Sequence, residues 1–244
     1  MFLRLATVVL FLLPTAVADS ADHIYDNNFN QWFVYSGDHK VSDKWGVHLE
    51  GQWRRWEFNT PQQLLLRPGI NFHLTDNVTL TGGYAFVSTH RAGQYPSLVP
   101  YNENRLFQQV AITHRAKRLN LQHRFRLEQR FVERRTLLPD GNRVTQGHNY
   151  FNRARYMFRL TTAINENWYF ATYNQLFINM APLKGSSAFG QNRAFAGVGF
   201  GIYKDSRLEF GYMQQTVLQS NRNVVELNHV GIHVSIYSTL PFMD

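Results

Sequence analysis

The chain of 244 residues contains no cysteine. Disulfide bonds, thiolate metal sites and a cysteine nucleophile are therefore excluded. Histidines are present, but His48, His73 and His229 lie in separate segments, and their spacing does not match a set of metal ligands. The chain also lacks a phosphate-binding glycine loop. We therefore expect neither a metal site nor a cofactor.

Charged residues are scarce, at 17% of the chain, whereas soluble domains have roughly 25%. Long apolar runs are absent too. Beyond the N-terminus no run approaches the roughly 18 residues of a membrane-spanning helix, and the mean hydropathy is −0.35. Aromatic residues, by contrast, reach 15%. This composition argues against a helical membrane protein and is typical of a β-barrel that meets lipid on its outside and water on its inside.

The N-terminus has the pattern of a secretory signal peptide. Arg4 supplies the positive charge, an apolar run covers 5–17, and small residues precede a cleavage site at Ala18. An uncleaved anchor is the alternative, but the run is short and polar residues follow it at once. We therefore assign residues 1–18 to a signal peptide and residues 19–244 to one exported domain.

Alternating polarity is the main structural signal. In the segment 119–133, Arg124, Arg126 and Glu128 fall on one face of an extended strand, and Phe125 and Leu127 fall on the other. On a helix these charges would be spread over all sides. The same alternation recurs at 45–54, 149–162, 193–203 and 226–238. Charges that point inward and apolar groups that point outward indicate a membrane barrel.

Turn signals divide the chain into candidate strands. The eleven segments are 28–36, 45–57, 63–74, 77–90, 102–116, 119–133, 149–162, 167–178, 191–203, 206–218 and 226–239. Single-chain bacterial barrels use an even number of strands, so we predict an all-β, closed antiparallel transmembrane barrel of about 12 strands, with about 10 as the alternative. A soluble β-sandwich also alternates, but its strands are usually shorter, at about 5 to 6 residues. Pro68 predicts a bulge or an early strand end near Gly69.

The connections alternate between short turns and long loops, and one of the predicted loops covers 134–148. Aromatic residues that stand near segment ends form the predicted interfacial girdle. They are Trp32, Trp56, Tyr101, Tyr150, Trp168, Tyr169, Tyr203 and Tyr237.

Several stretches resemble a bacterial outer-membrane family, domain of unknown function 2490. They are GY at 83–84, ENRLFQQ at 103–109, HRFRLEQRF at 123–131, NRARY at 152–156, QNR at 191–193 and LEFGY at 208–212. Members of that family usually have a glutamate near the position of Gln175, so this chain departs from the pattern there. The resemblance implies a porin-like barrel in the outer membrane of a Gram-negative bacterium and implies no settled activity.

We expect outer-membrane lipid and the barrel-insertion machinery as partners. Gly231, Val234 and Ile236 roughly fit the terminal-strand pattern that this machinery recognises, although the last aromatic, Phe242, stands two residues short of the end.

The predicted inward face is strongly basic. Its basic cluster consists of Arg105, Arg124, Arg126, Arg130, Arg153, Arg155, Arg159 and Arg193, and Arg54 and Arg67 belong to the same face. Its acids are Glu50, Glu103, Glu128 and Glu209. Since arginine cannot lose its proton, these groups need carboxylates, other acceptors, water or anions.

Two interpretations of this interior compete. In the first, arginine, glutamate and glutamine side chains brace a filled barrel. In the second, excess arginine favours small anions or acidic oligosaccharides in a narrow channel. Nucleic acid is not an expected partner, because the basic residues point inward and form no surface stripe.

An outer-membrane lipid hydrolase is the alternative from another class. His233 and Ser235 share one face of a strand, which makes them weak candidates for a base and a nucleophile. The chain has no Gly-x-Ser-x-Gly motif. A barrel without enzymatic activity is therefore the favoured interpretation.

Overall fold

The computed structural model describes residues 24–97, 99–180, 187–219 and 224–242, so the signal peptide predicted at 1–18 lies outside the described residues. The described part of the chain folds into eleven strands. They are β1 (Ile24–Lys40), β2 (Trp45–Trp56), β3 (Thr60–Thr75), β4 (Val78–Thr89), β5 (Tyr101–Ala116), β6 (Leu119–Leu137), β7 (Arg143–Ala163), β8 (Trp168–Met180), β9 (Phe189–Tyr203), β10 (Ser206–Gln219) and β11 (Val224–Ser238). Within these ranges, no helix is apolar and long enough to cross a membrane.

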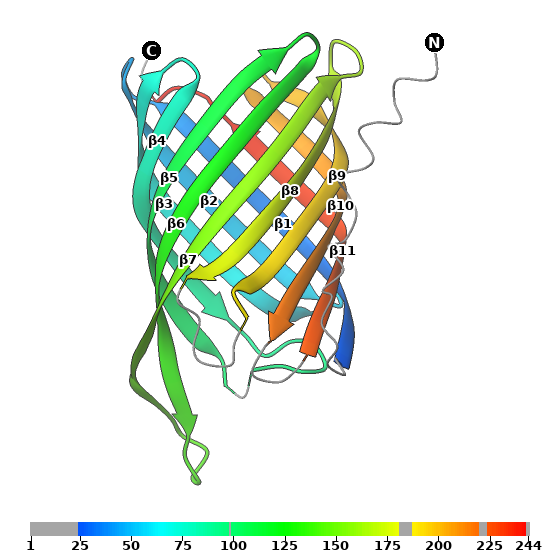
Figure 1. The fold of residues 1–244 in the computed structure, drawn as a ribbon. Coiled ribbons are helices and arrows are strands. Elements are labelled where there is room, and N and C mark those ends of the chain that lie inside the picture. Colours follow the sequence, from blue (N-terminus) through cyan, green and yellow to red (C-terminus); the bar gives the residue numbers. More distant parts are fainter. Residues whose placement is uncertain (1–23, 98, 181–186, 220–223, 243–244) are drawn as a thin grey trace.

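The strands form a closed barrel, as predicted (Figure 1). Neighbouring strands pair antiparallel, except that β1 and β11 pair in parallel from Ile24↔Val224 to Gly37↔Ser238. The predicted count of about 12 strands is close to the eleven observed, and the barrel is mixed rather than wholly antiparallel. The reason is geometric: in an up-and-down barrel with an odd number of strands, the first and last strands run in the same direction. The eleven segments found in the sequence were the correct count, and the expectation of an even number of strands led away from it.

The two-residue period places charges inside and apolar groups outside. On β6, Arg126 and Glu128 are 2% and 1% exposed, whereas Phe125 and Leu127 are 49% and 46% exposed. The outer wall consists of side chains such as Phe125 and Leu127, and the enclosed middle consists of side chains such as Arg126.

The two ends of the barrel differ. One end, which we call the turn end, has the short connections between β3 and β4, β5 and β6, and β9 and β10. The other, the loop end, has the longer connections (Figure 1). The loop predicted at 134–148 is instead largely β-hairpin: β6 and β7 stay paired out to Leu137↔Arg143, beyond a bulge at Glu133/Arg135. This hairpin projects past the rim of the barrel (Figure 1).

The strand β3 continues through Pro68, so the expected bulge or strand end near Gly69 does not occur. Pro68 keeps its register with Leu49 of β2. On the β4 side, pairs are recorded at Leu66↔Phe86 and Gly69↔Gly83 in one unbroken register, but not at the two positions between them. The missing proline N–H therefore interrupts one ladder locally and leaves the strand intact.

Glycines let aromatic rings lie flat on the inner wall. A Cβ on Gly83 would lie 2.4 Å from the Pro68 carbonyl oxygen and 2.8 Å from the ring of Phe107. A Cβ on Gly211 would lie 2.6 Å from the ring of Phe195. These close approaches fix Phe107 and Phe195 against the wall, and both rings are fully buried.

Candidate functional site

Two cavities of the interior are lined by described residues. A cavity of about 470 Å³ lies toward the loop end, where His90 and Tyr95 line it. A second, of about 340 Å³, lies toward the turn end, where Asp205 and Thr239 line it. We call them the loop-end cavity and the turn-end cavity. Among the described residues, only Gln52, Arg155 and Arg193 line both. The middle of the barrel is therefore a constriction built from side chains, with polar space on either side.

Glu128 on β6 is the most heavily paired acid of this constriction. It accepts hydrogen bonds from Arg153 Nε at 3.0 Å and from Arg155 Nη1 at 2.6 Å, and Arg67 Nη2 lies 3.6 Å away. Arg67 also pairs with Glu50, its direct neighbour across β2 and β3. One carboxylate thus faces three guanidinium groups, an arrangement that needs good hydrogen-bond geometry to offset desolvation.

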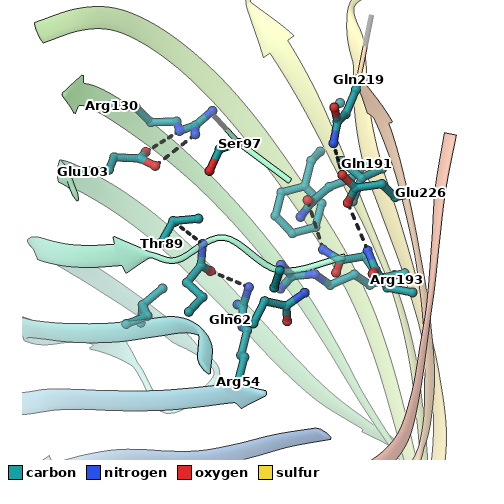
Figure 2. Close-up of a pocket in the computed structure, with 18 of the residues that line it drawn as sticks. Arg54, Gln62, Thr89, Ser97, Glu103, Arg130, Gln191, Arg193, Gln219 and Glu226 are labelled. Carbon is teal, nitrogen blue, oxygen red and sulfur yellow. Dashed lines mark hydrogen bonds and ion pairs between the residues drawn. The ribbon is translucent and has the colours of Figure 1, made fainter. Parts of the chain in front are cut away.

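The remaining two acids of the predicted set are paired as well. Glu103 accepts hydrogen bonds from Arg105 Nε at 2.6 Å and from Arg130 Nη2 at 3.0 Å. Figure 2 shows Arg130 and Glu103 turned toward each other in the loop-end cavity. Glu209 accepts from Arg159 and from the Tyr169 hydroxyl. Because Arg159 lies on β7 and Glu209 on β10, this ion pair crosses the interior.

Among the described residues, four arginines have no carboxylate within hydrogen-bond distance. Arg54 Nη1 donates to Gln63 at 2.6 Å, and Arg126 Nε donates to Gln109 at 2.9 Å. When the Gln215 amide is oriented with its oxygen toward Arg193, that oxygen lies 3.2 Å from Arg193 Nη2. For Arg124 no hydrogen bond or ion pair is recorded within the described ranges.

Aromatic rings support these arginines. The guanidinium carbon of Arg54 lies 3.8 Å from the Trp32 ring centroid, and that of Arg193 lies 4.8 Å from the same ring. The guanidinium carbon of Arg155 lies 4.4 Å from the Phe177 ring centroid, and that of Arg126 lies 4.9 Å from the Phe107 ring centroid. Cation–π contact is attractive and adds no negative charge, so it positions the arginines without neutralising them.

The structure brings the predicted basic and acidic residues together inside the barrel. Ten inward arginines face four inward glutamates, which leaves an excess of six positive charges among these fourteen residues. Other charged groups lie nearer the ends: Asp38, Asp205 and Glu226 add negative charge, and Arg207 adds positive charge.

The candidate pair His233 and Ser235 is buried and does not form a triad. Ser235 Oγ lies 3.4 Å from His233 Nδ1. The His233 ring packs against Phe195, with centroids 4.9 Å apart. In the part of the chain that the structure describes, no carboxylate is hydrogen-bonded to His233 to orient it as a base. This geometry does not support the lipid hydrolase.

Sequence reasoning missed the aromatic residues of the interior. Trp32, Tyr169 and Tyr237 were placed in the outer girdle, but they line the turn-end cavity. Their signal was available in the phase of the strands, because Trp32 stands two residues from inward-facing Asn30 on β1. Phe107 and Phe177 are also in phase with inward polar neighbours. Position near a strand end is a weaker guide than phase.

Gln175 is the position at which the resembled family usually has glutamate. Here its amide oxygen accepts from Arg155 Nη2 at 3.1 Å. The neutral amide fills the acceptor role without a charge, so Arg155 has Glu128 as its carboxylate partner.

Comparisons with known proteins give one sequence family and a few distant folds. The family described as "Protein of unknown function (DUF2490)" matches residues 29–226. Among solved structures, a NanC porin is 12% identical, with a TM-score of 0.47 over 81% of this chain and 89% of that one. The Pseudomonas putida toluene transporter TodX is 12% identical, with a TM-score of 0.37 over 74% of this chain and 62% of that one. No curated protein matches the chain. Because the family match covers most of its length, this chain belongs to the DUF2490 family.

Proposed function

We propose that this protein is an outer-membrane β-barrel of a Gram-negative bacterium whose narrow, arginine-lined interior favours anionic solutes. The arginine excess at the constriction is the observation that supports this proposal most strongly. Three features of the barrel support the proposal: the nature of the outer wall, the charge of the interior, and the space on either side of the constriction.

The outer wall supports a membrane location. Large apolar side chains cover it, and Leu66, Ile70 and Leu106 are 50% to 60% exposed. Soluble monomers rarely expose large contiguous apolar patches, because water penalises them. The strands have 12 to 21 residues, which exceeds the about 9 to 11 that a tilted strand needs to cross a bilayer. Trp168 and Tyr203 are exposed at strand ends, as an interfacial girdle requires.

The interior charge supports a preference for anions. A guanidinium stays protonated at any physiological pH, so the arginine excess is permanent. Rings of basic side chains favour anions in pores, because they replace part of the lost hydration shell. Arg54, Arg124, Arg126 and Arg193 contribute most, since none of them is hydrogen-bonded to a carboxylate among the described residues.

The two cavities combine the brace and the channel that the sequence left as alternatives. Glu128 and Glu50 hold the middle by ion pairs, while polar space extends from the middle toward each end. Arg155 and Arg193 line both cavities. In this proposal, an anion that leaves one cavity meets the same guanidinium groups on entering the next.

Planar-bilayer recording of the refolded barrel tests the proposal. In a salt gradient the reversal potential should report anion selectivity. Replacing Arg124, Arg126 and Arg155 together by glutamine should weaken that selectivity, whereas Arg115→Gln, at the exposed turn end of β5, should leave it unchanged. Cation selectivity would contradict the charge argument. Absence of conductance would refute the channel and favour a purely braced barrel.

A further inference from the structure

The turn-end cavity has two unlike walls. Arg124 on β6 and Arg155 and Arg159 on β7 form a basic wall. Tyr169 and Tyr173 on β8, with Tyr237 on β11, form an aromatic wall. The walls meet where the Arg159 guanidinium carbon lies 5.1 Å from the Tyr237 ring centroid. Because Tyr173 is the direct neighbour of Arg159 across β8 and β7, the two walls adjoin, and a molecule in this cavity would contact guanidinium groups and aromatic rings next to one another.

Several buried guanidinium donors of the interior have no acceptor among the described residues. The Nε groups of Arg124 and Arg155, which line the cavity, are buried without an acceptor. Arg67 Nε and Arg126 Nη1 are also buried without an acceptor, and both residues are only 2% exposed. Buried donors on charged groups normally find a partner, because an unmade hydrogen bond there carries a large desolvation penalty. Two of these donors, on Arg124 and Arg155, belong to residues that line the turn-end cavity from the neighbouring strands β6 and β7, and they call for an oxygen-rich anion.

Of the acids among the residues that line this cavity, Asp38, Glu50 and Glu209 have hydrogen-bond partners, although Glu209 Oε2 has none among the described residues, and Asp205 is exposed at the turn end. Glu50 accepts from Arg67, and Glu209 accepts from Arg159 and Tyr169. Asp38 accepts from Asn71 at 2.7 Å and contacts His48. None of these carboxylates is recorded as a hydrogen-bond acceptor for Arg124. The unpaired Nε donors of Arg124 and Arg155 therefore favour an added negative group.

The aromatic wall is rigid and has a polar group to offer. Tyr173 stacks on Phe195 with centroids 5.0 Å apart and an interplanar angle of 19°. Phe195 is held in turn by the close approach of Gly197 and Gly211. The Tyr173 hydroxyl donates to Met213 Sδ at 3.3 Å, and a thioether is a weak acceptor. A ligand oxygen would be the better partner for this hydroxyl.

We infer that the turn-end cavity binds a carboxylate that carries a six-membered ring, with the carboxylate on Arg124 and Arg155 and one face of the ring against Tyr173. Arginine forks match carboxylates, and tyrosine faces stack on rings. The volume of about 340 Å³ lies at the lower end of the roughly 300–1,000 Å³ of ligand pockets, so one ring fits. Aromatic acids and ring-form sugar acids share this chemistry. The inference rests on the proposed function and names its solute class.

Calorimetric titration of the refolded full barrel in detergent micelles tests it with four probes. Benzoate and glucuronate each carry both features, acetate lacks the ring, and benzamide lacks the charge. At least one ring acid should bind about tenfold or more tightly than both acetate and benzamide, since charged hydrogen bonds of this kind contribute at least that factor. The comparison of benzoate with glucuronate distinguishes aromatic acids from sugar acids.

Single substitutions test what each wall contributes to binding. Arg124→Gln should weaken the preferred acid about tenfold, and Tyr173→Leu should weaken it without changing acetate binding. Arg115→Gln makes the same charge change at an exposed position and should have no effect. If Arg124→Gln fails to refold, Arg124→Lys keeps the charge but loses the fork and should still weaken binding.

Three results would overturn the inference: benzamide that binds as tightly as benzoate, acetate that matches both ring acids, or Arg124 variants with unchanged affinity. Failure here is separable from failure of the proposed function. Anion-selective conductance without ring-acid binding refutes the cavity assignment alone. Ring-acid binding in a barrel that conducts cations, or does not conduct, refutes the channel alone.

Discussion

Glu128→Gln is the substitution that most directly perturbs the interior. The side chain is 1% exposed and accepts from Arg153 and Arg155, with Arg67 at 3.6 Å. Glutamine keeps the shape, but it removes the charge and turns an NH₂ group toward guanidinium donors. Removing one partner of a buried ion pair destabilises by about 3–5 kcal/mol. We expect the free energy of unfolding, from urea titration of the barrel in lipid vesicles, to fall by about that amount.

A matched control lies on the projecting hairpin. Glu133 pairs with Arg135 at 2.8 Å and accepts the Asn102 N–H at 2.9 Å, an acceptor role that a glutamine oxygen can keep, and both side chains of the pair are partly exposed. Glu133→Gln should lower the free energy of unfolding by about 1 kcal/mol or less, because solvent screens the pair. Adding Arg153→Gln to Glu128→Gln should recover part of the loss, since it removes one uncompensated charge. Equal effects of Glu128→Gln and Glu133→Gln would refute the claim that a desolvated ion-pair network holds the constriction.

Two further changes test packing and the hairpin. Gly83→Ala should destabilise the barrel by about 1–3 kcal/mol through overpacking, because the new methyl group meets Pro68 and Phe107, whereas Gly82→Ala has no atom within 4 Å and should be close to neutral. Equal urea midpoints for the two variants would contradict the close packing of Phe107. Replacing 134–148 by a two-residue turn should leave the unfolding midpoint unchanged, since that segment lies mostly beyond the rim; a lowered midpoint would show that the hairpin supports the wall.

Much of the fold could be predicted from sequence because the period of a strand is a local property. The phase of Arg126 and Glu128 against Phe125 and Leu127 is enough to separate inside from outside on β6. The strand number could not be fixed in this way. The closing pair of β1 and β11 is made by backbone hydrogen bonds in parallel, with a shift at Asn30/Gln31, and no side-chain pattern signals it.

The composition of the interior was predictable, but its pairing was not. Glu128 and Arg153 are partners because their strands are adjacent and in register. Arg159 and Glu209 are partners across the interior, between strands that are not neighbours. Such a contact depends on barrel diameter and side-chain reach, which a single sequence does not specify. The hairpin at 134–148 was missed because its polar residues resemble those of a loop.

The alternation of wet and lipid-facing positions along β6 is the central claim, and the absence of cysteine makes it measurable. Single variants Gln122→Cys, Arg124→Cys, Phe125→Cys and Leu127→Cys would each carry one nitroxide label in vesicles. Collision rates with oxygen, which concentrates in lipid, and with a water-soluble nickel chelate would then be compared. We predict oxygen access at 125 and 127 and a water-like environment at 122 and 124. Lipid access at 122 and 124, or no alternation along the four positions, would contradict the account.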